Sequence, residues 1–189
     1  MSGNTSATGG FLAPQDNAAT LEGDDLRNLL QELVVGCTGL AGALVRPRWQ
    51  PTPPTQPAPE TNWCAVGVVS RSPEGGEPWV GHNGAGDGGL GVDVLRRHET
   101  LDILASFYGP NSSAMAARLF NGLYINQNRE TLELNNAGLV GAGDVIAVPD
   151  LTNLQWINRH DLPFVIRREV TNTYLVRNLL EAPFEIITE

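Results

Sequence analysis

Histidine and acidic residues in the middle of the sequence are of the types that bind a catalytic metal ion. His82, Asp87, His98 and Asp102 could together hold an ion that activates water for hydrolysis. Their spacing argues against one site, because a strand would place His98 and Asp102 on one face but roughly 13 Å apart. We expect no catalytic residue, no metal site and no cofactor, and keep a small metal-dependent hydrolase as an alternative function.

Nucleotide-binding loops and catalytic nucleophiles are also poorly supported. Gly84, Gly86 and Gly89 fit the glycine spacing of a dinucleotide-binding loop, but the following residues LGVDVL indicate a strand where that loop needs a helix. The chain has no lysine, which excludes a Walker A phosphate loop. No serine has the G-x-S-x-G context, and neither Cys37 nor Cys64 has a histidine beside it in sequence. The sequence therefore does not favour an enzyme.

Large polar and aromatic side chains in expected loops and strand edges form the remaining candidate site. Arginine, tryptophan and tyrosine are enriched at interface hot spots, because they bury a large area and make several directional contacts. As a group, these residues favour a protein that binds other proteins. The interface residues that we predict are Arg46, Arg48, Trp49, Tyr108, Gln127, Asn128, Arg129, Trp156 and Arg159.

Length and charge limit the classes of partner. The chain has 189 residues and 20.3 kDa, enough for one domain with a tail. All 12 basic residues are arginine, and the 21 acids leave a formal charge of -9, which disfavours a DNA-binding surface. No apolar stretch approaches the ~20 residues of a membrane span, and the first residues lack a signal-peptide pattern. We expect a soluble, unexported protein with no membrane partner.

Periodicity predicts the elements that must position these residues. Leu26, Leu29, Leu30, Leu33 and Val34 recur at helical spacing after Asp24, a possible N-cap, and Gly36 and Gly39 end the pattern. The long strand 92–108 carries Leu101, Ile103, Ala105 and Phe107 on one face. Further strands are predicted over 42–50, 63–70, 145–148, 162–170 and 173–180, and further helices after Asn111 or Ser112 and over 128–134.

The segments between these elements are rich in proline, glycine or small polar residues. Residues 1–20 predict a flexible arm, the prolines of 51–59 a stiff connector, and 71–91 a long loop or loose hairpin. His160 and Asp161 are expected in a loop, and the last two strands are expected to join at Thr171 and Asn172. The resulting fold class is α+β, a mixed, largely antiparallel sheet with helices packed on one face. The domain prediction is a flexible arm, 1–20, and a single domain, 21–189.

Five segments carry a resemblance to a known family. The chain resembles the tail or neck terminator proteins of tailed bacteriophages and prophages over about residues 24–182, and the N-terminal arm is not matched. The segments are VRPRWQP (45–51), NWCAVGV (62–68), RHETLDILASFYGPNS (97–112), GLYINQNRETL (122–132) and VPDLTNLQWINRHDL (148–162).

This resemblance implies a structural virion protein with a tail-terminator-like fold and no catalysis. Such subunits, typically six, form a ring that caps the head-proximal end of the tail tube and joins it to the connector or adaptor proteins of the head. Genomic DNA would pass through the lumen without specific binding, and assembly would take place in the host bacterial cytoplasm. An acidic wall suits such a channel, because a basic wall would retard the phosphate backbone.

Other functions stay open at this point. Within the same class, the chain could be a stopper, an adaptor or a tube-end protein of the baseplate. A binding module that uses the proline segment 51–59 to capture a host partner is a further alternative.

Overall fold

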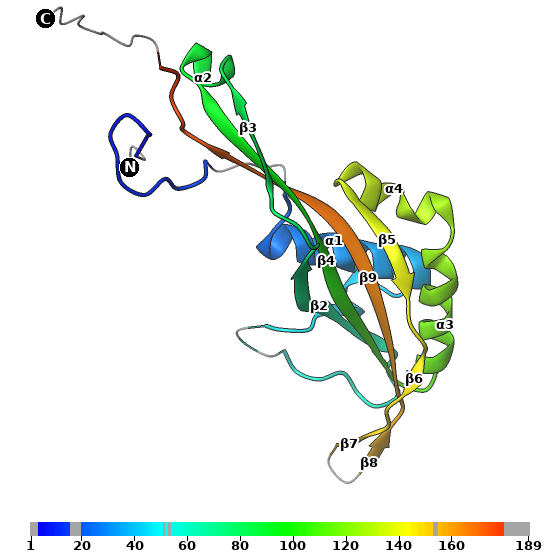
Figure 1. The fold of residues 1–189 in the computed structure, drawn as a ribbon. Coiled ribbons are helices and arrows are strands. Elements are labelled where there is room, and N and C mark those ends of the chain that lie inside the picture. Colours follow the sequence, from blue (N-terminus) through cyan, green and yellow to red (C-terminus); the bar gives the residue numbers. More distant parts are fainter. Residues whose placement is uncertain (1–3, 16–19, 51, 53, 153–154, 180–189) are drawn as a thin grey trace, which may run out of the picture. The chain divides into compact units, whose positions relative to one another are not determined.

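The computed structural model describes residues 4–15, 20–50, 52, 54–152 and 155–179. The chain divides into two compact units: the larger comprises 20–74 and 98–169, and the smaller 1–19, 75–97 and 170–189. Strands β4 (Val92–Tyr108) and β9 (Arg159–Tyr174) contribute residues to both (Figure 1). The single domain over 21–189 stays a prediction.

The larger unit contains a mixed sheet with the strand order β1-β2-β4-β9-β5. β1 (Val45–Pro47) runs parallel to β2 (Trp63–Pro73), whereas β2 is antiparallel to β4, and β5 (Ala137–Ala142) is antiparallel to β9. The short strand β6 (Ile146–Ala147) also pairs with β9. β7 (Asp150–Thr152) and β8 (Gln155–Ile157) form a separate hairpin.

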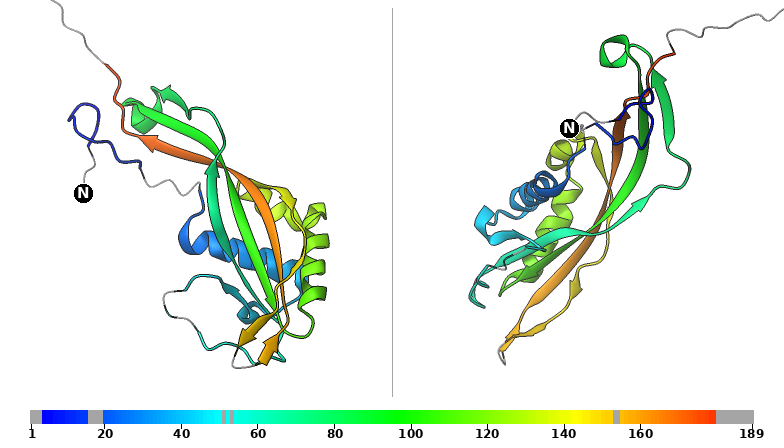
Figure 2. Two further views of the ribbon diagram at one scale, coloured as in Figure 1. Left: turned by 60° about the horizontal axis from the view of Figure 1, so that its bottom comes forward. Right: turned by 90° about the vertical axis from the view of Figure 1, so that its left-hand side faces the viewer.

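Three helices cover one face of this sheet (Figure 2). They are α1 (Gly23–Thr38), α3 (Ser112–Leu123) and α4 (Asn126–Leu134), and a short 3-10 turn, η1 (Gly42–Leu44), precedes β1. The predicted fold class, a largely antiparallel α+β sheet with helices on one face, is confirmed.

Helix α1 forms where the apolar periodicity predicted it. Its five predicted apolar residues are all buried, and Gly39 ends the helix in the left-handed region at φ 76° while its N–H donates to Val35 O. The predicted N-cap at Asp24 is wrong, because the N-cap position is Glu22, which makes no side-chain capping bond. The side chain of Glu22 contacts arginines instead.

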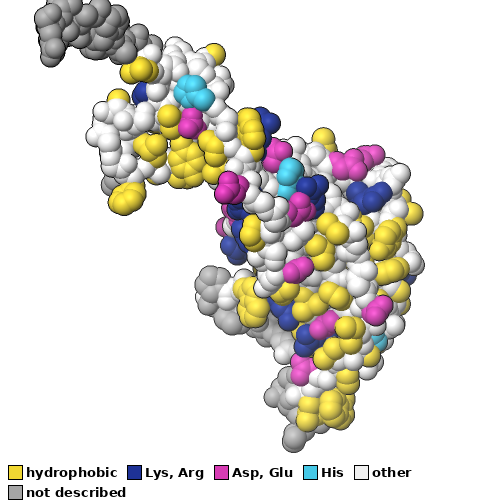
Figure 3. All heavy atoms as spheres, viewed as in Figure 1, with side chains coloured by type: hydrophobic (Ala, Val, Ile, Leu, Met, Phe, Trp, Pro, Cys, Tyr) yellow, Lys and Arg dark blue, Asp and Glu magenta, His cyan; other side chains and the backbone are white. Residues whose placement is uncertain are grey.

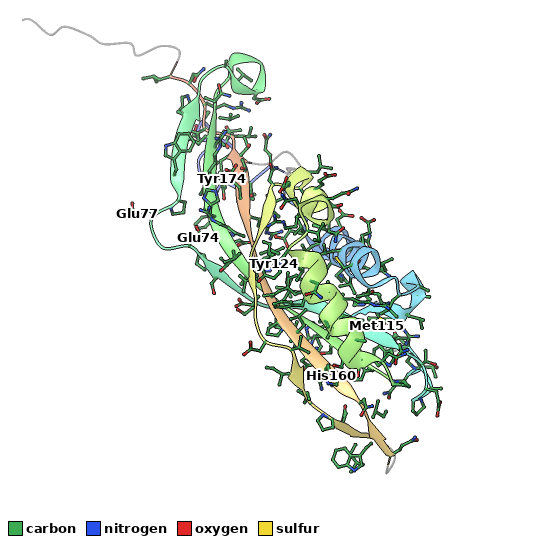
Figure 4. The ribbon with its side chains drawn as sticks, turned by 90° about the vertical axis from the view of Figure 1, so that its right-hand side faces the viewer. Glu74, Glu77, Met115, Tyr124, His160 and Tyr174 are labelled. Atoms are coloured by element: carbon green, nitrogen blue, oxygen red, sulfur yellow. The ribbon has the colours of Figure 1, made fainter. Side chains whose placement is uncertain are left out.

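The core is built on the alternation of β4. Leu101, Ile103, Ala105 and Phe107 are at most 1% exposed and belong to one cluster with the apolar residues of α1 and α3. Tyr124, just after α3, ties this layer to β5, because its hydroxyl accepts a 3.3 Å hydrogen bond from the Ala142 N–H (Figure 4). The predicted strand 92–108 is therefore confirmed.

Two predictions about the C-terminal half are wrong, and one strand was not predicted. Residues 159–174 form one strand, so there is no turn at Thr171 and Asn172. This segment has no glycine or proline there to impose a turn, and its threonines suit a strand. His160 and Asp161 lie on β9, not in a loop, because they pair with β6. β5 was missed because the glycines of AGLVGA hide its strand character.

A buried ion pair connects β4, β9 and the start of α1. The guanidinium of Arg168 donates to Glu99 over 2.8 and 2.7 Å, and both side chains are 4% exposed. Arg168 also contacts Glu22 and the Leu21 carbonyl oxygen. Partial burial raises the pKa of Glu22, but hydrogen bonds from Arg71 and Arg168 outweigh it and hold the pKa below its ordinary value.

The smaller unit contains a hairpin that holds the segment after β9. β3 (Trp79–Asn83) pairs with residues 92–96 of β4, and α2 (Gly86–Gly89) lies at the hairpin tip. This is the loose hairpin that the sequence predicted as one alternative. Arg177 forms an ion pair with Asp87, and the Asn178 N–H donates to Leu90 O over 2.8 Å. Part of the predicted arm also lies here, where Gln15 forms a β-bridge with Thr173.

His82 lies between two hydrogen-bond acceptors in this unit. Its Nδ1 is 2.7 Å from Asp93 Oδ1, and its Nε2 is 2.8 Å from Asn178 Oδ1. The Asn178 amide nitrogen donates to the carbonyls of Gly84 and Gly89, so its oxygen can only accept from His82. Because both ring nitrogens face acceptors, the hydrogen bonds with Asn178 and then Asp93 raise the pKa of His82.

Removing the charge of Arg168 should destabilise the larger unit strongly. In Arg168→Met, the buried Glu99 would lose the guanidinium that donates two hydrogen bonds to it, and breaking a buried ion pair costs ~3–5 kcal/mol in the free energy of unfolding. Urea denaturation would measure the change. The matched control is Arg167→Met, which removes an exposed ion pair with Glu74 and should cost at most ~1 kcal/mol. Equal effects of the two variants would contradict a structural role for the buried pair.

The contact between His82 and Asn178 should weaken as the pH rises. Since the pKa of His82 is raised above its ordinary 6.5, its stabilising contribution is complete below about pH 6.5 and is lost through the raised pKa. Amide exchange at Asn178, corrected for its intrinsic rate, should show protection that falls over this range. His82→Gln should remove the pH dependence of this protection, and the control His160→Gln should keep it. If the pH dependence is the same in both variants as in the unmodified chain, it does not come from His82.

Candidate functional site

The face of the larger sheet that carries no helix holds most of the predicted interface residues. Successive side chains of a strand point to opposite faces, so the residues between the core positions of β4 point away from the helices. Ser106 and Tyr108 lie there, opposite Ala65 and Trp63 of β2 in the register. Figure 3 views this side and shows arginine and acidic side chains among hydrophobic ones.

Two aromatic rings and two guanidinium groups form a stacked column on this face. Trp63 and Tyr108 are direct cross-strand partners, and their ring centroids lie 4.2 Å apart with planes 8° from parallel. The Arg46 guanidinium lies 5.9 Å from the Trp63 ring centre, and that of Arg159 lies 5.6 Å from the Tyr108 ring centre. Such contacts are favourable because the π face of the ring attracts the cation. The column therefore runs across β1, β2, β4 and β9.

Arg159 is fixed by a carboxylate on its own strand. Asp161 lies two residues further along β9 and accepts hydrogen bonds of 2.8 and 2.7 Å from Arg159 Nε and Nη2. These bonds raise the pKa of Arg159, and partial burial raises the pKa of Tyr108. Both groups keep their ordinary protonation at neutral pH. The pair positions Arg159 over the Tyr108 ring, and it leaves little net charge at this end of the column.

The segment after β1 lies against β2 because Gly67 has no side chain. The Arg48 N–H donates to Val66 O over 2.8 Å, and a Cβ on Gly67 would lie only 3.0 Å from Arg48 Cβ. Arg48 Nη1 donates to Ser106 Oγ over 2.8 Å, and its guanidinium lies 5.7 Å from the ring centre of Trp49. Trp49 is 69% exposed. The segment after the short edge strand β1 thus presents Trp49 to solvent beside the hydrogen-bonded Arg48.

A surface hollow of about 540 Å³ connects these groups. Its lining comes from β1 and the segment after it, from β2, from the end of β4 and from the start of the β7–β8 hairpin. Its charged and aromatic lining residues are Arg46, Arg48, Trp49, Trp63, Tyr108 and Asp150.

The structure brings five of the nine predicted interface residues together. Arg46, Arg48, Trp49 and Tyr108 line the hollow, and Arg159 contacts Tyr108. Trp156 is 67% exposed on β8, in the hairpin whose Asp150 lines the hollow. Their role as an interface stays a prediction.

The other three predicted residues lie on α4, which belongs to the helical layer. The Asn128 amide donates to Gly122 O over 3.0 Å, and Arg129 contacts Asn126. Gln127 is exposed on the same helix. Sequence reasoning missed Trp63 and Asp161, because the first was assigned to a central strand and the second to a loop. Only the strand register shows that Trp63 stacks on Tyr108.

The four candidate metal ligands have other partners. His82 contacts Asp93, and Asp87 pairs with Arg177 in the smaller unit. In the larger unit, His98 lies 3.8 Å from Glu169, and Asp102 accepts from Ser70 Oγ over 2.5 Å. Within the described residues, no group of three or more histidine, cysteine or acidic residues could hold a metal ion.

One serine–histidine pair resembles catalytic machinery, but its geometry is unsuitable. Ser112 Oγ lies 3.0 Å from His160 Nδ1, and Figure 4 shows His160 on β9. Ser112 begins α3 and is only 1% exposed, so its hydroxyl cannot reach a substrate in solution. Burial likewise raises the pKa of the Cys64 thiol, which therefore stays protonated.

None of the helices in the described part of the chain is both long enough and apolar enough to cross a bilayer.

Comparison with known proteins identifies the family. Among curated proteins, none matches the sequence. The family described as phage neck terminator protein matches residues 24–189, which include all five segments that carry the resemblance and the whole arginine–aromatic column. The match begins after the predicted arm, as the resemblance did. The chain therefore belongs to the phage neck terminator protein family, a family of structural proteins of the phage neck.

Proposed function

We propose that copies of this chain close into a ring that ends the tail tube at its head-proximal side. Each ring would join the tube protein to the connector or adaptor proteins of the head, and six copies is the number that the family resemblance implies. The observation that carries the proposal is the partly exposed arginine–aromatic column on the helix-free sheet face, beside the exposed Trp49. An arrangement of this kind, in a chain that belongs to the neck terminator family, favours a protein interface.

A ring needs two different patches on each subunit, because each copy contacts its two neighbours through unlike surfaces. The helix-free face with Arg46, Trp49 and Trp63 supplies one. The opposite edge of the sheet supplies a second, where α4 and β5 expose apolar side chains. There Leu134 is 84% exposed and Val140 59%. β5 is also the last strand in the sheet order, so one of its edges can receive another chain.

The charge of the chain agrees with a channel that lets DNA pass. With a formal charge of -9, each copy repels the phosphate backbone overall, so the genome would meet a wall with little affinity for it. Assembly in the host cytoplasm and incorporation into the particle follow from the same proposal. A stopper or adaptor in the neck is the alternative within this class, and locating the chain in a particle reconstruction would separate the two.

Purified chain should form a closed oligomer. Size-exclusion chromatography with light scattering should give about six times the 20.3 kDa monomer mass, and negative-stain images should show particles with a central hole. The mass should stay constant as the protein concentration rises, because a closed ring has no free interface. A monomer at all concentrations, absent from purified particles, would refute the ring.

Reversing the charge of Arg46 should impair assembly without impairing folding. Arg46 lies over Trp63 on a partly exposed edge strand, and a glutamate there would meet an acidic neighbour. Association should weaken at least about tenfold, since like charges across an interface cost several kcal/mol. Sedimentation would measure association, and thermal melting would measure folding.

The matched control for this variant is Arg96→Glu. Arg96 makes the same type of contact, 5.6 Å from the Trp79 ring centre, but in the smaller unit. Assembly of Arg96→Glu should stay near that of the unmodified chain. Normal assembly of Arg46→Glu would show that the column is not an assembly interface.

A further inference from the structure

A second hollow lies beside the first on the larger unit. It has a volume of about 550 Å³ and shares Pro47, Arg48, Trp49 and Gln50 with the first hollow. Its floor is apolar and comes from α1, β1 and β2. Leu26, Leu30, Val66 and Val68 are the aliphatic residues that line it. The two hollows therefore adjoin at residues 47–50, and we call the pair the depression, with an apolar part and an aromatic part.

The edge of β2 is open beside this second hollow. β1 pairs only with Cys64, Ala65 and Val66, whereas β2 continues to Pro73. Within the described residues, no strand pairs with that side of β2 after Val66. An edge with unpaired backbone N–H and C=O groups beside an apolar floor is the geometry in which an extended peptide adds to a sheet.

Arg46 and Arg48 outnumber Asp150, the acidic residue that lines the first hollow, so the charges of the depression favour an acidic segment. Arg27 and Arg71 form exposed ion pairs with Asp24 and Glu22. Arg46 donates to the carbonyl oxygens of Ala43 and Thr55, and Arg48 to the Ser106 hydroxyl. In the part of the chain that the structure describes, neither Arg46 nor Arg48 has a salt bridge.

One segment of this chain has the matching chemistry. Residues 180–189, LEAPFEIITE, contain three glutamates and no basic residue. Phe184, Ile186, Ile187 and Thr188 are types favoured in strands and on an apolar floor. The segment follows residues 177 and 178, which are tied to the hairpin of the smaller unit, and it lies inside the family match.

We propose that residues 180–189 of a second copy bind in this depression, as an acidic strand added to the open edge of β2. The carboxylates contact Arg46 and Arg48, and the apolar side chains cover the floor of the second hollow. The inference rests on the proposed ring for the presence of a second copy. It assigns the groove of one subunit to the C-terminal segment of its neighbour.

Binding of the isolated segment tests the groove directly. A fluorescent peptide of residues 180–189 would be titrated into the full chain carrying Glu181→Gln, Glu185→Gln and Glu189→Gln, so that its own segment does not compete. We expect saturable binding that weakens at least about tenfold when Arg48→Glu is added, and that falls with salt. Arg46→Glu, at a position without a hydrogen bond to the buried Ser106, gives the same result should Arg48→Glu disturb folding. Arg96→Glu is the control and should leave the affinity unchanged.

Absence of binding, or binding that neither Arg46→Glu nor Arg48→Glu weakens, overturns the groove as the docking site. A peptide with its three glutamates replaced by glutamine should bind at least about tenfold more weakly. Equal binding of the two peptides overturns the charge complementarity on which the assignment is built.

Mixing two defective chains tests whether the segment comes from a second copy. One chain carries Arg46→Glu and Arg48→Glu, and the other carries the three Glu→Gln substitutions in the segment. Each alone should fail to associate, but together they retain one intact groove and one intact segment, so light scattering should show a mixed complex. If the chain with the three Glu→Gln substitutions binds the peptide but forms no complex with the other variant, the segment does not bind to a second copy. That result overturns the proposal.

The same measurements separate this inference from the ring. A chain with the three Glu→Gln substitutions that still forms a closed ring overturns the inference and leaves the ring standing. If the unmodified chain binds the peptide but stays monomeric, the ring is overturned. The assignment of the segment to a second copy is then overturned as well.

Discussion

The alternation of β4 is the constraint on which the larger unit depends. Leu101, Ile103 and Phe107 must be buried, so the helices have to pack on that face of the sheet. The same alternation directs Ser106 and Tyr108 to the other face, where they meet Arg48, Arg159 and Trp63. A shift of one residue in the register would exchange the two faces. The core and the candidate interface are therefore fixed by one register and cannot vary independently.

The candidate face combines two properties that an assembly surface needs. Its tryptophan and tyrosine rings offer a large apolar area, while the guanidinium groups over them keep that area hydrated in the free subunit. Arginine suits this position better than lysine, because a planar guanidinium stacks on a ring and still donates hydrogen bonds at its edge. Arg159 does both, since it lies over Tyr108 and binds Asp161 with two hydrogen bonds. The chain uses no lysine anywhere.

Sequence reasoning succeeded where the signal is periodic and local. The helix with Leu26 and Leu30 and the strand with Leu101 and Ile103 follow from spacing alone, and the family follows from five separate segments. It failed where pairing decides, as at Thr171, which lies within a continuous strand that the sequence divided in two. Trp63 could not be assigned to the site, because its stacking on Tyr108 depends on a register between residues 45 positions apart.

Some arginines are paired with acidic residues inside the subunit and others are not, and this difference bears on how acidic copies can associate. A subunit that must not retain DNA gains from a negative surface, yet copies that are all strongly negative repel each other. Arg168 and Arg159 are already neutralised within the subunit by Glu99 and Asp161. Arg46 and Arg48 donate only to uncharged oxygens and lie in a depression. If acidic residues of a neighbour cover these two cations, association is favoured locally. In the proposed ring, fewer positive groups would then face passing DNA than in the free subunit.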